Sequence, residues 1–186
     1  MARTPSNMMP LGTTAPYFKL LDTVSNEILR LSDLKGERGT VVMFICNHCP
    51  FVIHVNSELV SIANNYSEKG IEFIAISSND AINYPQDGPE NMALHAKTEG
   101  YPFPYLYDET QAIAKAYDAA CTPDLYIFDA DLKLIYRGQL DDSRPGNGVP
   151  LTGNDLHHAL DCLLSGEENT KTQKPSIGCN IKWKND

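Results

Sequence analysis

The sequence predicts one α/β domain with a mixed central sheet and helices on both faces. Two apolar runs, 41–45 and 71–77, flank a segment of helical spacing, which is the pattern of a βαβ unit with parallel strands. Two later strands, 124–129 and 132–138, are joined by turn residues and add an antiparallel hairpin. The chain has 186 residues, 42% of them hydrophobic, which suits one domain with a full core.

The first expected elements form a short hairpin. Residues 17–23 and 26–34 show rough alternation of polar and apolar side chains, with turn residues between them. The turn "GERGT" then leads into "VVMFI", Val41 to Ile45. This run is continuous and rich in β-branched residues, as in a strand that is buried on both faces.

A helix is expected directly after Pro50, followed by a second buried strand. Gly70 is a good end signal for the helix, and the strand is expected over 71–77. The apolar positions with helical spacing are Phe51, Val52, Val55, Leu59, Ile62, Ala63 and Tyr66.

Beyond residue 77 the pattern predicts a loop and three further helices. The loop contains two prolines and a glycine, and the helices are expected over 89–100, 109–119 and 151–166. Residues 167–186 are polar and are predicted to be a C-terminal tail that packs on or trails from the domain, which spans 1–166. Ile181 and Trp183 suggest that the end of this tail docks.

Charge and hydropathy limit the partners. The net charge of −9 argues against non-specific binding to nucleic acid or to an anionic membrane, since both need a basic patch. The longest apolar run, "TVVMFIC", is too short to span a bilayer, and no secretory signal is visible. We therefore predict a cytoplasmic protein, in a compartment where thiols are kept reduced.

The stretch Cys46-Asn47-His48-Cys49-Pro50 is the main candidate site. It lies between a predicted strand and a predicted helix, where unpaired N–H groups and the helix dipole stabilise a thiolate. The pKa of Cys46 is therefore expected to be lowered. His48 can add positive charge or a hydrogen bond, and Pro50 costs no hydrogen bond so early in a helix.

Three interpretations of this CxxC pair compete. A zinc site needs four ligands, but the sequence has no second CxxC, and His54 fits a helix face instead. A purely structural disulfide is disfavoured in the cytosol. The redox interpretation is favoured, and no metal is assigned to the site.

The chain resembles the thioredoxin superfamily, and within it the peroxiredoxin-like, AhpC/TSA-type branch of thiol–disulfide oxidoreductases. The resemblance is carried by "VVMFICNHCPFV", "AISSNDAINYPQDGPENM", "YPFPYLYDETQAIAKAY", "CTPDLYIFDADLKLIYRGQLDDSRPG" and "SIGCNIKW". It implies a thioredoxin-like, three-layer fold with Cys46 as nucleophile, Cys49 as resolving thiol and His48 as a tuner of pKa and potential. It also implies no organic cofactor, because the electrons pass through thiols.

The resemblance further implies that Pro123 is a cis-proline facing the CxxC. The backbone of Thr122 would then be free to pair with an extended partner segment. Cys121, two residues before Pro123, is a candidate third thiol if it is not simply a buried apolar side chain. Cys179 is a second candidate, with an inert tail anchor as the alternative.

Two positions depart from the parent families. Peroxiredoxins carry a Thr or Ser three residues before the reactive cysteine, where this chain has Met43, and thioredoxins carry a Trp where it has Ile45. The expected function is thiol–disulfide exchange with protein or small-molecule thiols and disulfides. The alternatives are a thiol-dependent peroxidase acting on hydroperoxides, and a metal-binding or metal-delivery module. Peroxide reduction is expected to be slow, because Met43 cannot donate a hydrogen bond.

Overall fold

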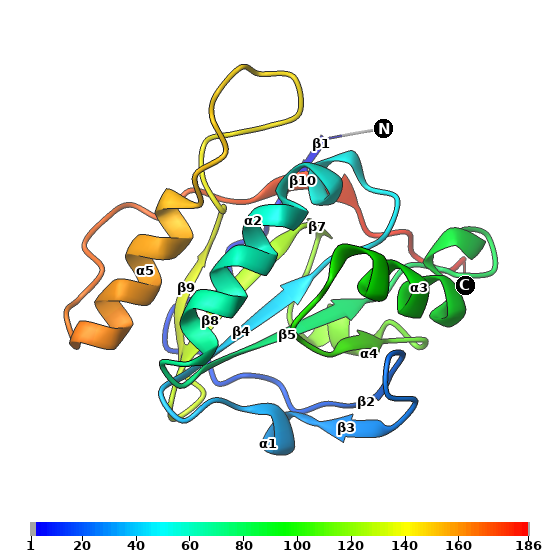
Figure 1. The fold of residues 1–186 in the computed structure, drawn as a ribbon, viewed down its shortest axis with the longest axis horizontal. Coiled ribbons are helices and arrows are strands. Elements are labelled where there is room, and N and C mark those ends of the chain that lie inside the picture. The colour runs from blue at the N-terminus through cyan, green and yellow to red at the C-terminus, as the bar shows by residue number, and fades with distance from the viewer. Residues whose placement is uncertain (1–2, 186) are drawn as a thin grey trace.

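A seven-stranded mixed sheet forms the centre of the molecule in the computed structural model, which describes residues 3–185 (Figure 1). The strand order is β3-β2-β6-β5-β4-β8-β9. Parallel pairing joins β4 to β5 and β5 to β6, and the other pairs are antiparallel. The strands are β2 (Lys19–Asp22), β3 (Ile28–Arg30), β4 (Gly39–Phe44), β5 (Ile71–Ser77), β6 (Tyr105–Tyr107), β8 (Asp124–Asp129) and β9 (Leu134–Gly138).

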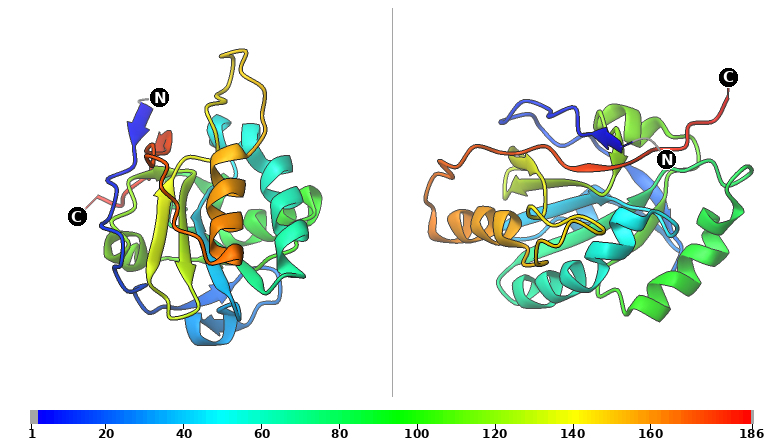
Figure 2. Two further views of the ribbon diagram at one scale, coloured as in Figure 1. Left: turned by 90° about the vertical axis from the view of Figure 1, so that its left-hand side faces the viewer. Right: turned by 90° about the horizontal axis from the view of Figure 1, so that it is seen from above.

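Helices cover both faces of this sheet. The longer ones, α2, α3 and α5, lie on one face, and the short α1 and α4 lie on the other (Figure 2). The helices are α1 (Leu31–Leu34), α2 (Pro50–Ser67), α3 (Pro89–Glu99), α4 (Ala112–Ala116) and α5 (Asn154–Ser165), with a 3-10 turn, η1 (Pro85–Asp87). The predicted three-layer, thioredoxin-like architecture is confirmed.

Strand β4 divides the core into two clusters. Val41 and Met43 face α2, α3 and α5, whereas Val42 and Phe44 face the layer that contains α1 and α4. All six residues of β4 are buried, because successive side chains of a strand point to opposite faces and here both faces are covered. This central strand holds the segment that leads into the CxxC pair.

A second, smaller sheet joins the two ends of the chain. Its order is β1 (Arg3–Pro5), β10 (Ile177–Asn180) and β7 (Cys121–Thr122), and both pairs are antiparallel. Both terminal segments run along the same side of the molecule, opposite α2 and α5 (Figure 2). β10 lies within the polar stretch 167–186 that the sequence analysis treated as a tail; the domain boundary at residue 166 stays a prediction.

Three local expectations differ from the structure. Residues 31–34 form α1 instead of extending a strand, since Leu31 turns inward and is buried against Phe18 and Phe44 in the same cluster. The helix expected over 109–119 is limited to α4. β6 was not expected, because three residues are too few to show a strand period.

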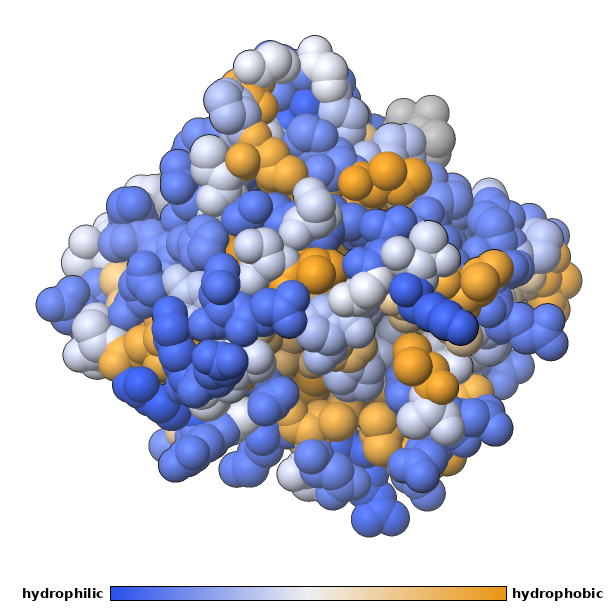
Figure 3. All heavy atoms as spheres, in the orientation of Figure 1, coloured by the Kyte–Doolittle hydropathy of each residue, from blue (hydrophilic) through white to orange (hydrophobic). Residues whose placement is uncertain are grey.

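The surface is mostly polar. In the face drawn in Figure 3, apolar side chains occur in separate small groups among hydrophilic ones. Among the described residues, none of the helices has both the length and the apolar character needed to cross a bilayer.

Candidate active site

The CxxC pair lies where β4 passes into α2. Cys46 follows the strand, Cys49 is the N-cap of the helix, and Pro50 is its first residue. This placement confirms the strand-to-helix junction expected from the sequence. Both cysteines are buried, with exposed fractions of 1% for Cys46 and 0% for Cys49, and both are thiols.

The Thr122–Pro123 bond is cis and lies beside the two sulfurs, as predicted. Thr122 Oγ1 is 3.4 Å from Cys46 Sγ, and the Thr122 carbonyl oxygen is 3.1 Å from Cys49 Sγ. One residue of β7 therefore contacts both thiols, although it is 76 residues from Cys46 in the chain.

The lowered pKa lies on Cys49, not on Cys46 as the sequence analysis expected. The Cys46 thiol donates a hydrogen bond to the Cys49 sulfur, and the Cys179 thiol and the backbone N–H of Val52 add to it, which lowers the pKa of Cys49 to about 5. The same bond raises the pKa of Cys46 well above its ordinary value, and burial and the charge of Asp87 act in the same direction. The hydrogen bond between the two thiols is thus the largest cause of the difference, because it stabilises the thiolate of Cys49 and the thiol of Cys46.

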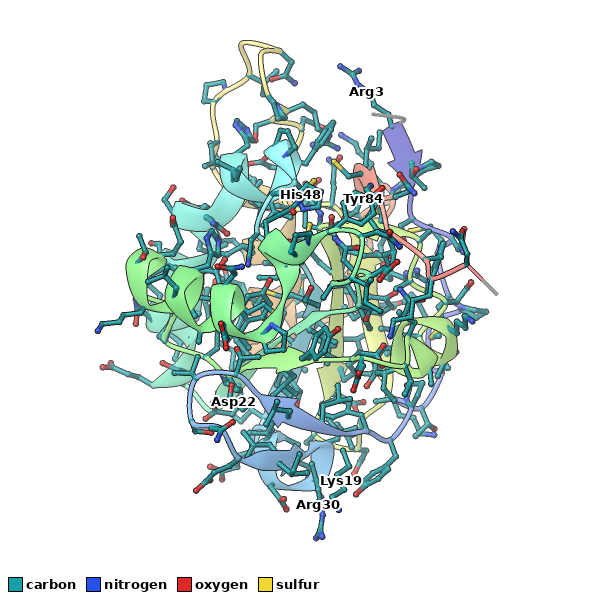
Figure 4. All side chains as sticks on the ribbon, turned by 90° about the vertical axis from the view of Figure 1, so that its right-hand side faces the viewer. Arg3, Lys19, Asp22, Arg30, His48 and Tyr84 are labelled. Carbon is teal, nitrogen blue, oxygen red and sulfur yellow. The ribbon has the colours of Figure 1, made fainter. Side chains whose placement is uncertain are left out.

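His48 is held by a buried carboxylate. Its Nδ1 is 2.6 Å from Asp87 Oδ2, an ion-pair distance at an angle that does not meet hydrogen-bond geometry. The imidazole also stacks on Tyr84, with ring centres 5.7 Å apart (Figure 4). Asp87 is fully buried and accepts hydrogen bonds from the Asn79 side chain and the Asn47 backbone.

Asp87 was not among the candidate residues from the sequence, where its segment is expected to be a loop. No local signal distinguishes it, because its partners lie on other parts of the chain. Cys46, His48 and Asp87 offer ligand atoms that all lie within 4.8 Å of one another. A thiolate, an imidazole and a carboxylate are ligands that suit a borderline-soft divalent ion.

A third thiol reaches the site from β10. Cys179 Sγ lies 2.8 Å from Cys49 Sγ, across 130 residues of sequence. The other candidate, Cys121, directs its thiol to the carbonyl oxygen of Pro123 at 3.6 Å, and burial raises the pKa of Cys121. The structure thus brings Cys179 into contact with the pair; a redox role for Cys121 stays a prediction.

The backbone edge of Thr122 is not free, which corrects the expectation drawn from the resemblance. β10 pairs with β7 there, with Cys179 opposite Thr122 and Asn180 opposite Cys121. The C-terminal segment thus occupies the position at which an extended partner segment was expected. A short strand in a polar segment gave no sequence signal of this pairing.

The sequence matches the model of the AhpC/TSA family over residues 11–137. The chain belongs to the AhpC/TSA family. This membership places it among the thioredoxin- and peroxiredoxin-like oxidoreductases, whose substrates are thiols, disulfides or peroxides. A search of curated proteins found no significant match.

Solved structures resemble this AhpC/TSA protein closely. An uncharacterized conserved protein from Geobacillus kaustophilus is 61% identical, with a TM-score of 0.98, and the match covers 100% of this chain and 98% of that one. A hypothetical protein from Sinorhizobium meliloti 1021 is 45% identical, with a TM-score of 0.94 and coverage of 97% and 98%. The thioredoxin domain of a thiol-disulfide oxidoreductase from Bacteroides vulgatus shares the fold at 16% identity, with a TM-score of 0.66 and coverage of 84% and 99%.

Proposed function

We propose that this protein is a thiol–disulfide oxidoreductase that uses Cys46 and Cys49 as its redox pair. The observation that carries the proposal is the hydrogen-bonded dithiol at the helix N-terminus, in which one sulfur has a pKa of about 5. At neutral pH such a pair holds one proton and one thiolate, which is the state that thiol–disulfide exchange requires.

Cys46 is the nucleophile in this proposal, although both thiols are buried. Cys49 Sγ is closely covered by the Thr122 carbonyl oxygen and by Cys179, so a bulky disulfide cannot reach it directly. Cys46 is adjacent to the partly exposed His48. In the forward step Cys46 gives its proton to Cys49, attacks one sulfur of the substrate disulfide and releases the other as a thiolate. This substrate thiolate takes the proton from Cys49, which becomes a thiolate again. Cys49 then attacks Cys46, which closes the Cys46–Cys49 disulfide and releases the second substrate sulfur.

Thr122 and Pro123 are proposed to form the partner-binding surface. A small depression beside Pro123 is lined by side chains of α2, including Phe51 and His54, and by Arg144 and Ile177. Because β10 already pairs with Thr122, an extended partner has either to displace β10 or to bind over this depression.

Thiol mapping in a redox buffer tests the proposal. The Cys179→Ser protein, which lacks the thiol that contacts Cys49, is equilibrated at a series of glutathione ratios, quenched with acid, alkylated and digested, and the state of each cysteine is measured by mass spectrometry. We expect Cys46 and Cys49 to lose alkylation together and reversibly, and Cys46→Ser to abolish reduction of insulin. Cys162→Ser, on α5, serves as the matched control with unchanged activity. Independent oxidation of Cys46 and Cys49 would contradict the proposal.

Peroxide reduction is the second candidate, and the Thr122 hydroxyl favours it. Met43 has no hydroxyl to donate, yet Thr122 Oγ1 lies 3.4 Å from Cys46 Sγ. A donor at that place can stabilise the charge that develops on a departing peroxide oxygen. Stopped-flow oxidation by hydrogen peroxide tests this role: Thr122→Val should slow it about 10²-fold if the hydroxyl serves as that donor, whereas the exposed Thr98→Val should not. An unchanged rate in Thr122→Val would exclude the role.

Metal binding is a third candidate, which rests on the cluster of Cys46, His48 and Asp87. Native mass spectrometry of the reduced protein with Zn²⁺ or Cu⁺ tests it directly. If the cluster is a metal site, one ion binds per chain, and Asp87→Asn or His48→Ala weakens binding. The control is Asp131→Asn, in the β8–β9 turn. Binding that survives both site variants would exclude this cluster.

A further inference from the structure

Strand β10 presents Cys179 to the redox pair in a fixed position. β1 pairs with one edge of β10 and β7 pairs with the other, so the backbone of Cys179 is held from both sides. Beyond the strand, the Ile181 N–H donates to the Ala120 carbonyl oxygen, and the Gln111 side chain donates to the Lys182 carbonyl oxygen. These long-range bonds anchor the segment that follows the thiol.

Gly178 allows this close approach. A Cβ atom at this position would lie 1.9 Å from the Thr122 carbonyl oxygen and 2.6 Å from its carbon. Since no real Cβ contact is so short, only glycine permits β10 to pair with β7 in this register. The residue before Cys179 is therefore suited to bringing that thiol against Cys49.

We propose that Cys179 is a third redox-active thiol, which exchanges with the Cys46–Cys49 disulfide to form a Cys49–Cys179 disulfide and to return Cys46 as a thiol. The inference rests on the proposed function, because it requires the Cys46–Cys49 disulfide as its starting state. The geometric basis is the distance of 2.8 Å between the sulfurs of Cys49 and Cys179. This distance exceeds the length of a disulfide bond by less than about 1 Å.

The exchange is balanced and needs no external oxidant. Cys179 gives up its proton and attacks Cys49 Sγ, so one S–S bond forms while the Cys46–Cys49 bond breaks. Cys46 leaves with the electron pair of that bond and takes up a proton. The protein remains two electrons oxidised, and Cys49 is now bonded to Cys179 of β10 instead of to Cys46.

The charge around Cys179 changes in favour of this attack once the pair is oxidised. In the reduced protein, burial, the hydrogen bond to Cys49 and the charge of Cys49 together raise the pKa of Cys179 to about 12. The last two causes disappear when Cys49 is in a disulfide. Lys182 acts in the opposite direction and favours the thiolate.

The expected chemical role of the Cys49–Cys179 disulfide is to protect the oxidised state of the protein or to pass it on. In the new disulfide, Cys49 is bonded to the segment that covers the Thr122 edge, and Cys46 is again available to attack a second substrate. The partner is therefore part of this chain itself: β10 occupies the site as an extended substrate segment would occupy it, with its cysteine opposite Thr122.

Disulfide mapping of the full chain tests the proposal. Trypsin releases Cys46 and Cys49 in one peptide, 39–69, and Cys179 in another that ends at Lys182. Reduced protein is oxidised with one equivalent of diamide, and samples taken over time are acid-quenched, alkylated and digested. We expect the internal disulfide of peptide 39–69 to appear first, and the cross-linked peptide pair, alkylated at Cys46, to grow at its expense. Cys46→Ser should give the cross-linked pair almost completely.

The controls separate this inference from the proposed function. Cys179→Ser should form only the internal disulfide, and Cys162→Ser should behave as the wild type. The inference alone would be overturned by two results together. The wild type would form the internal disulfide but no cross-linked peptide pair, and Cys46→Ser with a wild-type circular dichroism spectrum would form no cross-linked peptide pair either. Absence of the internal disulfide in both wild type and Cys179→Ser would instead overturn the proposed function.

Discussion

Cys49 has more contacts that stabilise a thiolate than Cys46 has, and this difference determines how the reduced protein responds to pH. Cys49 is the N-cap residue of α2, and its hydrogen bonds with Cys46, Cys179 and the Val52 backbone lower the pKa of its thiol. Cys46 instead faces the Asp87 carboxylate, which disfavours a second negative charge. One proton is therefore shared in the pair, and it resides on Cys46 at rest.

We predict that the reduced protein becomes more stable as pH rises from about 5 towards 8.5. The folded pKa of Cys49, about 5, is below its unfolded value of about 8.5. The contribution of Cys49 to the free energy of unfolding is therefore complete above the pKa of the unfolded state. It is lost as pH falls through the pKa of the folded state. The slope is at most about 1.4 kcal/mol per pH unit. Above pH 8.5 the raised pKa of Cys46 reverses the slope, because only the unfolded chain then loses that proton.

Urea unfolding at pH 5, 7 and 8.5 measures this effect. The oxidised protein is the control, since neither sulfur titrates in a disulfide, and Cys49→Ser should also lose the rise. A rise of the same size in the oxidised protein would show that other groups cause it.

At the scale of elements, the position of β10 depends on Gly178. We predict that Gly178→Ala separates β10 from β7, because the added methyl would overlap the Thr122 carbonyl group. The expected loss of stability is about 1–3 kcal/mol, as for overpacking elsewhere. Hydrogen exchange of the Cys179 and Ile181 amides should accelerate. Asn180→Ala, at an exposed position on the same strand, should leave the exchange rate of these amides unchanged. Equal protection of the amides in both variants would contradict a role of Gly178 in placing β10.

The β8–β9 hairpin is fixed below Pro123 by a fully buried ion pair. Arg137 Nη2 lies 3.0 Å from Asp124 Oδ2, and the guanidinium also lies over the Tyr126 ring at 4.5 Å. Burial raises the pKa of Asp124, and the arginine charge opposes that rise. The pair thus holds the strand that begins directly after the cis bond.

We predict that Arg137→Met lowers the free energy of unfolding by about 3–5 kcal/mol, since it leaves Asp124 as an unpaired buried charge. Replacing both partners, by Arg137→Met with Asp124→Leu, should recover much of the loss, because no charge then remains buried. Chemical denaturation measures both. If the double variant is as unstable as the single one, packing and not charge explains the effect.

At the scale of the whole molecule, the sequence predicts what local patterns encode. The buried strand at Val41, the helix after Pro50 and the CxxC junction each follow from side-chain periodicity, and all three are confirmed. The contacts that complete the site join distant parts of the chain. Asp87 reaches Asn47 across 40 residues, and Cys179 reaches Cys49 across 130. Cys179 was a candidate third thiol from the sequence, but its short strand leaves no periodic signal that places it beside Cys49. A single carboxylate such as Asp87 leaves no signal at all.

Burial of the site limits how a substrate can reach the two thiols. Both thiols are almost inaccessible, and β10 covers the backbone edge beside them. A small oxidant could therefore reach Cys46 with less rearrangement than a protein disulfide, for which β10 or the region around His48 has to move. We expect exchange with protein disulfides to depend on the mobility of β10.

Trapping of a mixed disulfide shows directly whether Cys46 is the attacking thiol and Cys49 the resolving one. Cys49→Ser protein is reacted with a disulfide-bonded substrate such as insulin, quenched with acid, and analysed by mass spectrometry. The account predicts a stable mixed disulfide at Cys46, which the wild type resolves and Cys46→Ser does not form. A mixed disulfide at Cys49 in Cys46→Ser, with none at Cys46 in Cys49→Ser, would reverse the assigned roles. Absence of a mixed disulfide in both variants would contradict thiol–disulfide exchange by this pair.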